Sequence, residues 1–199
     1  MFEPTAESSG QKGAVFLDRD GTIIHEVNYL HRIQDIELLP EAGKAIAELN
    51  RRQIPVILIT NQSGVARGKF TEEFVKKSHR HLQRLLQEEG AHLDDFFFCP
   101  HHPEAGSLPY RRSCNCRKPA PGMLLEAAKR YSLDLQQSYV IGDKLVDVEL
   151  ARKTGGKGIL VETGYGLQEK VNLENCGIKP DIICANLNQA VDWILQQQP

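Results

Sequence analysis

Residues 14–22 read AVFLDRDGT, in which four apolar residues lead into a charged turn. A short, continuous apolar run is typical of a strand that is covered on both faces of a sheet. Further runs of this kind follow along the chain, namely 55–60 (PVILIT), 96–98 (FFF), 139–141 (YVI), 158–161 (GILV) and, in the tail, 181–184 (DIIC). The sequence therefore predicts a sheet of buried strands whose first member is 14–17.

Stretches with helical spacing lie between these runs. Ala42, Ala45, Ile46 and Leu49 fall on one stripe of a helix over 41–52. Thr71 can cap a further helix that stops at Gly90. Three more helices are expected over 121–131, over 145–154 and around Trp193, and the second of these ends before Gly155 and Gly156. Strands that alternate with helices predict an α/β fold, with a Rossmann-like parallel sheet that carries helices on both faces.

The composition is that of an ordinary globular domain. With 199 residues, 41% hydrophobic and 25% charged, the chain fits one domain over 14–199 after a flexible polar segment over 1–13. The net charge of −2 lacks the basic excess of a nucleic-acid-binding protein. The longest apolar run, 54–59, is too short for a membrane span, and 1–13 lacks the apolar core of a signal peptide. We therefore expect a cytoplasmic protein, by default a monomer, with no nucleic-acid or membrane partner.

Acidic residues follow two of the predicted strands. Ligands of open α/β sheets bind outside the carboxyl ends of the strands. Asp18 and Asp20 follow the first strand, and Asp143 and Asp147 follow the fourth. Side chains two apart in an extended segment point the same way, so a pair can face one small volume. One such pair alone fits a solvated acidic turn, and an EF-hand loop is excluded because its sixth position is Ile23. The two pairs together predict a site for a hard cation, Mg²⁺.

The residues near these acids favour phosphoryl transfer. A carboxylate beside Mg²⁺ can hold the metal, or it can attack phosphorus and form an aspartyl-phosphate. Thr60 and the backbone amides after it offer a phosphate cradle, and Lys118, beside Arg117, offers a compact positive charge. No glycine-rich P-loop is present, which argues against a P-loop nucleotidase. Capture of a phosphorylated ligand without chemistry remains the alternative from another functional class.

A long loop rich in Pro, His, Arg and Cys follows the third strand, and loops of this length are usually functional. Cys99, His101, Cys114 and Cys116 offer three thiolates and one imidazole, a closed tetrahedral set for structural Zn²⁺. His102 competes with His101 for the fourth position. The alternative to a zinc site is that these cysteines are buried thiols without a metal, and a disulfide is disfavoured in a reducing compartment. Cys176 and Cys184 receive no role. Zinc here would fold the loop just before Arg117 and Lys118.

Four segments in fixed order resemble the motifs of the haloacid dehalogenase-like phosphohydrolases: DRDGT (18–22), TNQSG (60–64), RKP (117–119) and GDKLVD (142–147). The resemblance implies that Asp18 is the nucleophile, while Asp20 protonates the leaving alcohol and later deprotonates water. It implies that Mg²⁺ is held by Asp18, the backbone carbonyl of Asp20 and Asp143, with Lys144 beside the metal but not a ligand. It further implies that Thr60 and Lys118 steady the phosphoryl group.

Within this superfamily, the zinc-binding loop together with GVARGKF (64–70) and CRKPAPGM (116–123) resembles the heptose-bisphosphate phosphatases. The resemblance implies an essentially capless enzyme that removes the C7 phosphate of a small phosphosugar, in the route to nucleotide-activated heptose for surface polysaccharides. Its implied substrate contacts are Glu26, Val27, Asn28, Tyr29, Thr60, Asn61, Gln62, Ser63, Arg117 and Lys118, with Arg117 the main recognition residue. EVNY (26–29) departs from the D-x-G-Y expected there. Histidinol-phosphate phosphatases, which have a shorter zinc loop and lack ARGKF, are the alternative.

Overall fold

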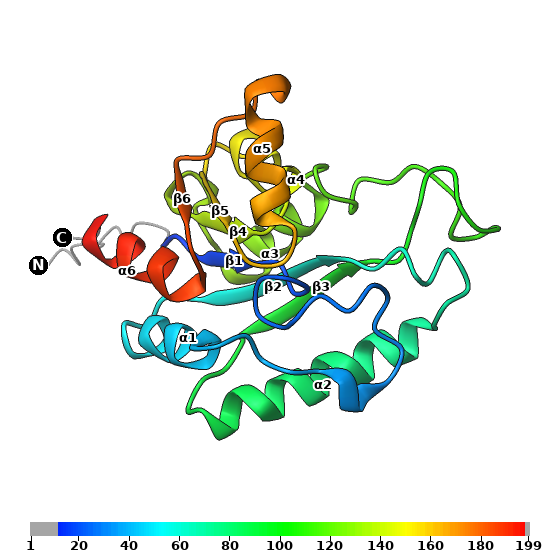
Figure 1. Cartoon of the computed structure of the whole chain (residues 1–199), viewed down its shortest axis with the longest axis horizontal. Coiled ribbons are helices and arrows are strands. Elements are labelled where there is room, and N and C mark those ends of the chain that lie inside the picture. The colour runs from blue at the N-terminus through cyan, green and yellow to red at the C-terminus, as the bar shows by residue number, and fades with distance from the viewer. Residues whose placement is uncertain (1–11, 198–199) are drawn as a thin grey trace, which may run out of the picture.

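A computed structural model describes residues 12–197, so the expectation of a flexible segment over 1–13 falls almost wholly outside the described residues. Six parallel strands form one sheet in the order β3-β2-β1-β4-β5-β6 (Figure 1). Their bounds are β1 Val15–Leu17, β2 Val56–Asn61, β3 Asp95–Cys99, β4 Tyr139–Gly142, β5 Lys157–Val161 and β6 Ile182–Cys184. All six predicted strands are therefore confirmed. The strand order reverses between β1 and β4, which is where ligands of such sheets bind.

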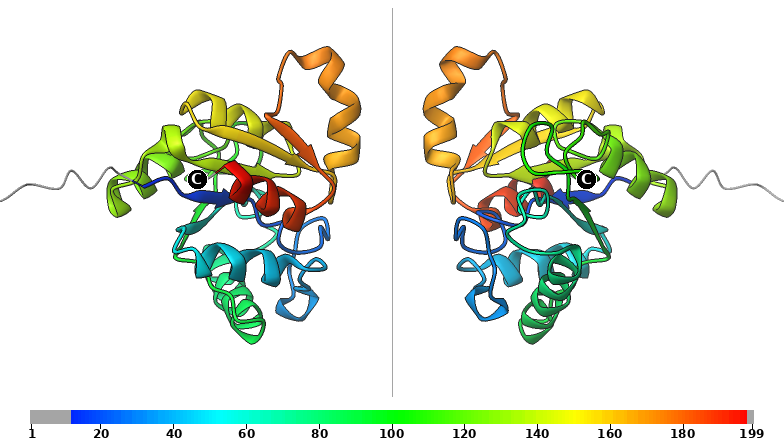
Figure 2. Two further views of the ribbon diagram at one scale, coloured as in Figure 1. Left: turned by 90° about the vertical axis from the view of Figure 1, so that its left-hand side faces the viewer. Right: turned by 90° about the vertical axis from the view of Figure 1, so that its right-hand side faces the viewer.

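Helices cover both faces of the sheet, as the alternation of elements predicts. One face carries α1 (Ala42–Arg51), α2 (Glu72–Glu88) and α6 (Leu187–Gln197), and the other carries α3 (Gly122–Tyr131) and α4 (Leu145–Lys153). Figure 2 shows α1 and α2 on one side of the sheet, with α4 on the other. The fold is thus a Rossmann-like α/β sheet, as expected from the sequence.

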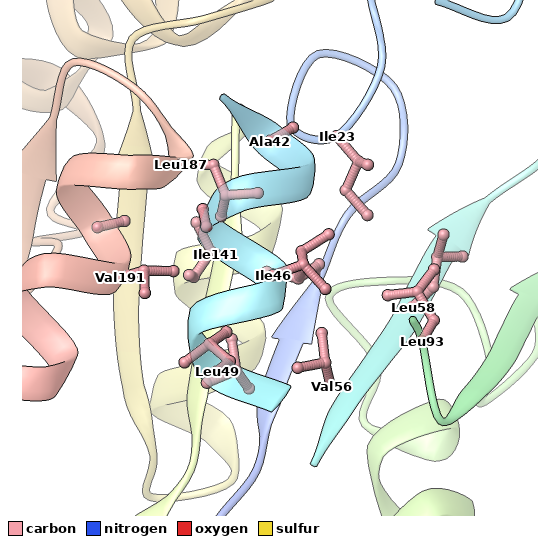
Figure 3. Close-up of a cluster of buried hydrophobic side chains, with 14 of the residues drawn as sticks. Ile23, Ala42, Ile46, Leu49, Val56, Leu58, Leu93, Ile141, Leu187 and Val191 are labelled. Atoms are coloured by element: carbon pink, nitrogen blue, oxygen red, sulfur yellow. The ribbon is translucent and has the colours of Figure 1, made fainter. Parts of the chain in front are cut away.

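Strand alternation divides the core into two layers. Val15 and Leu17 pack toward α1, α2 and α6, whereas Phe16 packs toward α3 and α4. In the first layer, Ile46 and Leu49 of α1 lie between side chains of the sheet and of α6 (Figure 3). Because both faces of β1 are fully buried, the short strand is held rigidly, and the charged turn that follows it starts from a fixed point.

Local signals set the ends of α2. The Thr71 side chain accepts a hydrogen bond from the backbone N–H of Phe74, and Glu72 and Glu73 occupy the first turn. The cap satisfies a free N–H group, and the two negative charges interact favourably with the helix dipole, so both features stabilise the N-terminus of α2. Gly90, with a φ of +73°, follows the last turn. The predicted helix start and stop are confirmed.

Two features were not predicted from the sequence. Helix α5 (Gly166–Cys176) lies over β5, and its sequence GLQEKVNLENC has too few apolar residues to form a long stripe. Two of them, Leu167 and Val171, are exposed. The second feature is a pair of short 3-10 turns. One, η1 (Ile33–Asp35), lies in the connection from β1 to α1, and the other, η2 (Leu135–Gln137), lies between α3 and β4. No cap domain is inserted between the elements of residues 12–197, in keeping with the capless expectation.

No helix among residues 12–197 combines the length and the apolar character needed to span a membrane.

Two neighbouring leucines of α3 offer a matched test of the packing. Leu124 is 1% exposed in the second core layer, and Leu125 is 49% exposed. We expect Leu124→Ala to lower the free energy of unfolding by roughly 2–5 kcal/mol, because it removes buried methyl groups and leaves a cavity. Leu125→Ala should change it by about 0.5 kcal/mol or less. Urea denaturation of both variants measures the difference, and equal losses would contradict this packing.

Candidate active site

A cleft opens beside the carboxyl ends of β1, β2 and β4, at the reversal of strand order. Its volume of about 270 Å³ is suited to a small polar ligand. Asp18, Asp20 and Lys144 line it, together with most of the predicted substrate contacts: Glu26, Asn28, Tyr29, Thr60, Asn61, Gln62, Ser63 and Lys118. Two predicted contacts are not part of this lining. Val27 is 39% exposed, and Arg117 donates a hydrogen bond to the backbone carbonyl of His101.

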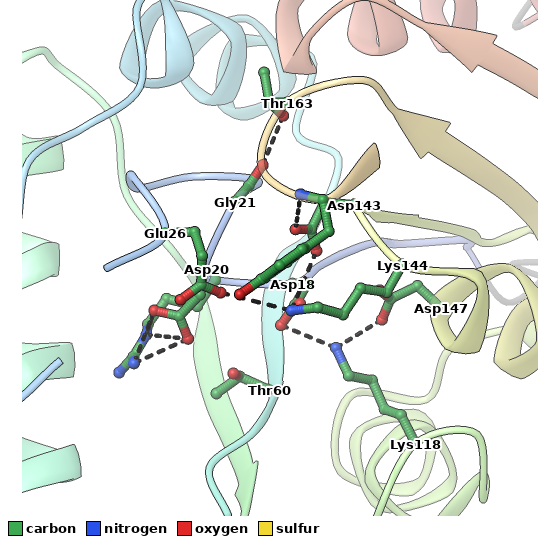
Figure 4. A network of polar contacts seen from close by, with 12 residues as sticks. Asp18, Asp20, Gly21, Glu26, Thr60, Lys118, Asp143, Lys144, Asp147 and Thr163 are labelled. Carbon is green, nitrogen blue, oxygen red and sulfur yellow. Dashed lines mark hydrogen bonds and ion pairs between the residues drawn. The ribbon is translucent and has the colours of Figure 1, made fainter. Parts of the chain in front are cut away.

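Three buried carboxylates, Asp18, Asp143 and Asp147, form an acidic floor next to the cleft (Figure 4), and of these Asp18 is part of the cleft lining. Asp18 directly follows β1 and Asp143 directly follows β4, and these parallel strands pair with Leu17 opposite Ile141. Asp147 lies in the first turn of α4. One oxygen from each of the three carboxylates lies within 4.8 Å of the others. Like charges this close need a neutralising partner.

Lys118 supplies part of that neutralisation. Its buried ammonium Nζ lies 2.9 Å from Asp18 Oδ1 and 2.6 Å from Asp147 Oδ1, and it donates a hydrogen bond to the carbonyl of Ile59. The Asn61 side chain exchanges two hydrogen bonds with the backbone N–H and carbonyl of Lys118. Burial opposes the charge on Lys118, but Asp147 and Asp18 outweigh it and raise its pKa. Asp147 is therefore paired with a lysine, and its carboxylate also lies with Asp18 and Asp143 in the group that could hold a cation, where the sequence pattern put it.

The pKa values of Asp18 and Asp143 are shifted in opposite directions. Burial raises the pKa of Asp18, but Lys118 and Lys144 outweigh burial, so the pKa lies below its ordinary value. Burial and the charge of Asp18 raise the pKa of Asp143 to about 7. The Oδ2 atom of Asp143 accepts a hydrogen bond from the backbone N–H of Tyr165, while its buried Oδ1 has no hydrogen-bond donor among residues 12–197. Asp18 is thus held ionised, and Asp143 is left with an unmatched acceptor.

This acceptor is the kind of group that a hard cation would bind. Carboxylate and carbonyl oxygens are the preferred ligands of Mg²⁺. Gly21 and Gly164 approach Asp143 so closely that a Cβ atom on either would lie 2.2–2.3 Å from Oδ2. Both glycines have positive φ, which other residues rarely adopt. The donor set fits Mg²⁺, and the backbone around Asp143 is built for close approach.

Lys144 joins the carboxylates to the next loop. Its Nζ lies 3.6 Å from Glu26 Oε2, 3.8 Å from Asp143 Oδ1, and 4.6 Å from the centre of the Tyr165 ring. Glu26 also accepts a hydrogen bond from the backbone N–H of Asn28. The segment that was expected to contact substrate is therefore tied to the acidic floor through one lysine.

Asp20 faces the same cleft and contacts other groups. Gln62 donates to Asp20 Oδ2 and to Thr60 Oγ1, each over 2.9 Å. Because the Thr60 oxygen accepts from Gln62, its own hydrogen remains available for a ligand. The two acidic side chains of the first motif thus have different neighbours: lysines lie near Asp18, whereas the Gln62 amide and the Arg19 guanidinium contact Asp20.

The cysteine-rich loop brings together a second group of metal-ligand atoms. The Cys116 sulfur lies 3.2 Å from that of Cys99 and 3.3 Å from that of Cys114, and the His101 Nδ1 lies 3.3 Å from the Cys116 sulfur. All four ligand atoms lie within 4.8 Å of one another, an arrangement that fits one tetrahedral Zn²⁺. His102 is outside this group, because its Nδ1 accepts from the backbone N–H groups of Glu104 and Ala105.

Three residues of the site received no role from the sequence. Arg19 contacts Asp20, Thr163 donates a hydrogen bond to the carbonyl of Gly21, and the Tyr165 backbone holds Asp143. Thr163 and Tyr165 follow the carboxyl end of β5, so the rule that located Asp18 and Asp143 also points to them. For Arg19, the signal is its position between two acidic residues.

Comparisons with known proteins agree with this geometry. The family model described as "Haloacid dehalogenase-like hydrolase" matches residues 15–88, and a second model of HAD-like hydrolases matches residues 115–190. The D-glycero-D-manno-heptose-1,7-bisphosphate 7-phosphatase of Thermosynechococcus vestitus is 42% identical, over 91% of this chain and 94% of that protein. The D-glycero-beta-D-manno-heptose-1,7-bisphosphate 7-phosphatase of Escherichia coli is 38% identical, over 92% of this chain and 87% of its own.

A solved structure is similar over nearly its full length. The D,D-heptose 1,7-bisphosphate phosphatase from B. bronchiseptica, complexed with magnesium and phosphate, has a TM-score of 0.82 and 33% identity. The similarity covers 93% of this chain and 99% of that one. This chain therefore belongs to the haloacid dehalogenase-like hydrolases and, among them, to the family of D-glycero-D-manno-heptose-1,7-bisphosphate 7-phosphatases.

Proposed function

We propose that this protein is a Mg²⁺-dependent phosphatase that hydrolyses the C7 phosphate of D-glycero-D-manno-heptose 1,7-bisphosphate. The product, heptose 1-phosphate, would serve the synthesis of nucleotide-activated heptose for surface polysaccharides. The observation that carries the proposal is the buried Asp18–Lys118 pair on the floor of a small polar cleft, in a chain 42% identical to a phosphatase named for this substrate.

Asp18 is the nucleophile in this proposal. Its pKa lies below the ordinary value, so the carboxylate is ionised at neutral pH. A carboxylate oxygen forms a bond to phosphorus while the bond from phosphorus to the sugar oxygen breaks, which leaves an aspartyl-phosphate. Lys118 and the Thr60 hydroxyl lie in the same cleft and stabilise the negative charge on the phosphoryl oxygens.

Asp20 moves the protons. It gives a proton to the sugar oxygen as that oxygen leaves, and it then takes a proton from the water that attacks the aspartyl-phosphate. The second step breaks the bond between phosphorus and Asp18 and releases inorganic phosphate. A group in hydrogen-bond reach of both oxygens serves both steps. Asp20 lines the cleft with Asp18, and its side chain is 18% exposed.

Asp18, Asp143 and the backbone carbonyl of Asp20 would hold Mg²⁺, with Lys144 beside the ion. The unmatched Oδ1 of Asp143 and the pKa of about 7 support a bound cation there, since a cation would stabilise the ionised form. When bound, Mg²⁺ neutralises charge on the phosphoryl group. The B. bronchiseptica phosphatase has magnesium and phosphate in its crystal structure.

Cys99, His101, Cys114 and Cys116 would hold a structural Zn²⁺. A closed set of four protein ligands leaves no position for substrate, so its effect on the reaction is indirect. The last ligand, Cys116, directly precedes Arg117 and Lys118. We infer that the metal fixes the chain ahead of these two cations, with Lys118 at the phosphoryl group. Arg117, which lies outside the cleft lining and bonds to the carbonyl of His101, would turn toward the cleft to recognise the sugar.

The remaining contacts to the substrate are assigned to the loop 26–29 and to 60–63. Both segments contribute to the cleft, and Lys144 connects Glu26 to the acidic floor. We further place the protein in the cytoplasm as a monomer. The five cysteines form no disulfide in the part of the chain that the structure describes, and three of them belong to the proposed zinc set.

The nucleophile is tested by Asp18→Asn. An amide is a poor nucleophile, so we expect turnover of the sugar phosphate to fall by roughly 10³-fold or more. Phosphate release is the measurement. Asp192→Asn, an exposed position on α6, is the matched control and should keep wild-type activity. Substantial turnover by folded Asp18→Asn protein would refute the assignment.

The substrate is tested by direct comparison. We expect kcat/KM for heptose 1,7-bisphosphate to exceed that for histidinol phosphate by at least about tenfold, because a cleft shaped for one substrate binds its transition state preferentially. Steady-state phosphate release at matched concentrations measures both values. A preference for histidinol phosphate would overturn the substrate but leave the nucleophile in place.

The zinc set is tested by Cys116→Ser. We expect the purified variant to lose its zinc and to melt at a lower temperature, since metal binding and loop folding are coupled. Elemental analysis and thermal unfolding measure these effects. Cys176→Ser removes an exposed thiol outside the set and should retain full zinc. If wild-type protein carries no zinc after expression in zinc-replete medium, the site is not a zinc site.

A further inference from the structure

Arg19 is a buried cation between the two acidic residues of the first motif. Its side chain is 3% exposed, and Nε and Nη2 lie 3.0–3.2 Å from both oxygens of the Asp20 carboxylate. A guanidinium is planar, so contacts from two of its nitrogens restrain the orientation of the carboxylate as well as its position. A lysine would act as a point charge and leave that orientation free.

Arg19 is itself fixed at both ends. Its Nη1 donates a hydrogen bond to Ser78 Oγ over 3.0 Å, and that hydroxyl donates to the carbonyl of Val75 within α2. Its backbone carbonyl accepts from the N–H groups of Ile23 and Ile24 over 2.9 Å and 3.1 Å. The turn after β1 and the buried face of α2 therefore hold one side chain between them.

Asp20 receives donors on both carboxylate oxygens and still faces the cleft. Nε and Nη2 of Arg19 contact Oδ1 and Oδ2, and Gln62 also donates to Oδ2. The Asp20 side chain lines the cleft and is 18% exposed, so a bound ligand can reach it. The guanidinium and the Gln62 amide together keep the carboxylate from turning away from the cleft.

We propose that Arg19 is a positioning residue for Asp20, and that Ser78 of α2 fixes Arg19 in this role. The inference rests on the proposed function, because it assumes that Asp20 protonates the leaving group. Proton transfer needs the donor and acceptor oxygens within hydrogen-bond reach. A freely rotating Asp20 would satisfy this condition only part of the time.

A comparison of leaving groups separates positioning from general damage. A sugar alkoxide needs a proton in order to leave, whereas 4-nitrophenolate leaves readily without one. The value of kcat/KM reports the first chemical step, so loss of a positioned acid lowers it for the sugar phosphate alone. We expect Arg19→Met to lower kcat/KM for heptose bisphosphate by about 10²-fold, and for 4-nitrophenyl phosphate by about threefold or less. Arg19→Lys should fall between wild type and Arg19→Met.

Two further variants complete the test. Ser78→Ala keeps the Arg19 charge and removes one hydrogen bond, so it should show the same selectivity on a smaller scale, and it replaces Arg19→Met if that variant does not fold. Arg130→Met removes an exposed arginine of α3 that pairs with Asp95 of β3 and Glu126 of α3. It should change kcat/KM for neither substrate.

The outcomes distinguish this inference from the proposed function. If wild-type protein hydrolyses 4-nitrophenyl phosphate but not heptose bisphosphate, the proposed substrate is wrong, and another alkyl phosphate takes its place in the comparison. If wild type hydrolyses both substrates, and folded Arg19→Met or Ser78→Ala lowers both equally or lowers neither, the positioning role of Arg19 is overturned.

Discussion

The ion pairs of Lys118 are the contacts on which the rest of the site depends. Asp18 and Asp147 are buried together with Asp143, and like charges in such surroundings are tolerated only when cations lie among them. Lys118 and Lys144 bring two positive charges against three carboxylates, and burial together with the charge of Asp18 raises the pKa of Asp143. A divalent cation would turn this deficit into a positive site, which is what an incoming phosphate dianion requires.

The position of Lys118 depends in turn on two separate anchors. Asn61, at the end of β2, holds the Lys118 backbone through two hydrogen bonds. The cysteine cluster begins at Cys99, the last residue of β3, and ends at Cys116, two residues before Lys118. The long loop therefore leaves the sheet and returns to it beside neighbouring strands. The cysteine cluster of this loop and the acidic floor are thus linked through Lys118, although one offers thiolate and imidazole ligands and the other offers carboxylates.

Much of this arrangement follows from sequence rules, and the exceptions have physical causes. The strands were predictable because their apolar runs are continuous. Asp18 and Asp143 were predictable because they directly follow strands, and Thr60 because it lies at the end of β2. Helix α5 has too few apolar residues to form a long stripe, so periodicity could not reveal it. The choice of His101 over His102 depends on the path of the loop. The ion pair between Lys118 and Asp147 was not predicted, because sequence spacing does not show that the lysine reaches that carboxylate.

The two acidic residues of the first motif contact cations of different shape, and this difference matches their proposed tasks. Lys118 presents a compact charge to Asp18, which lowers the pKa of the carboxylate without fixing its plane. A nucleophile needs a charged oxygen that can approach phosphorus in line. Arg19 presents a planar group to Asp20, which restrains orientation. A proton donor that must reach first an alkoxide and then a water depends on direction more than on charge. Arg19 continues the alternation of Val15 and Leu17, which pack toward α2, so its guanidinium contacts both Ser78 of α2 and the Asp20 carboxylate.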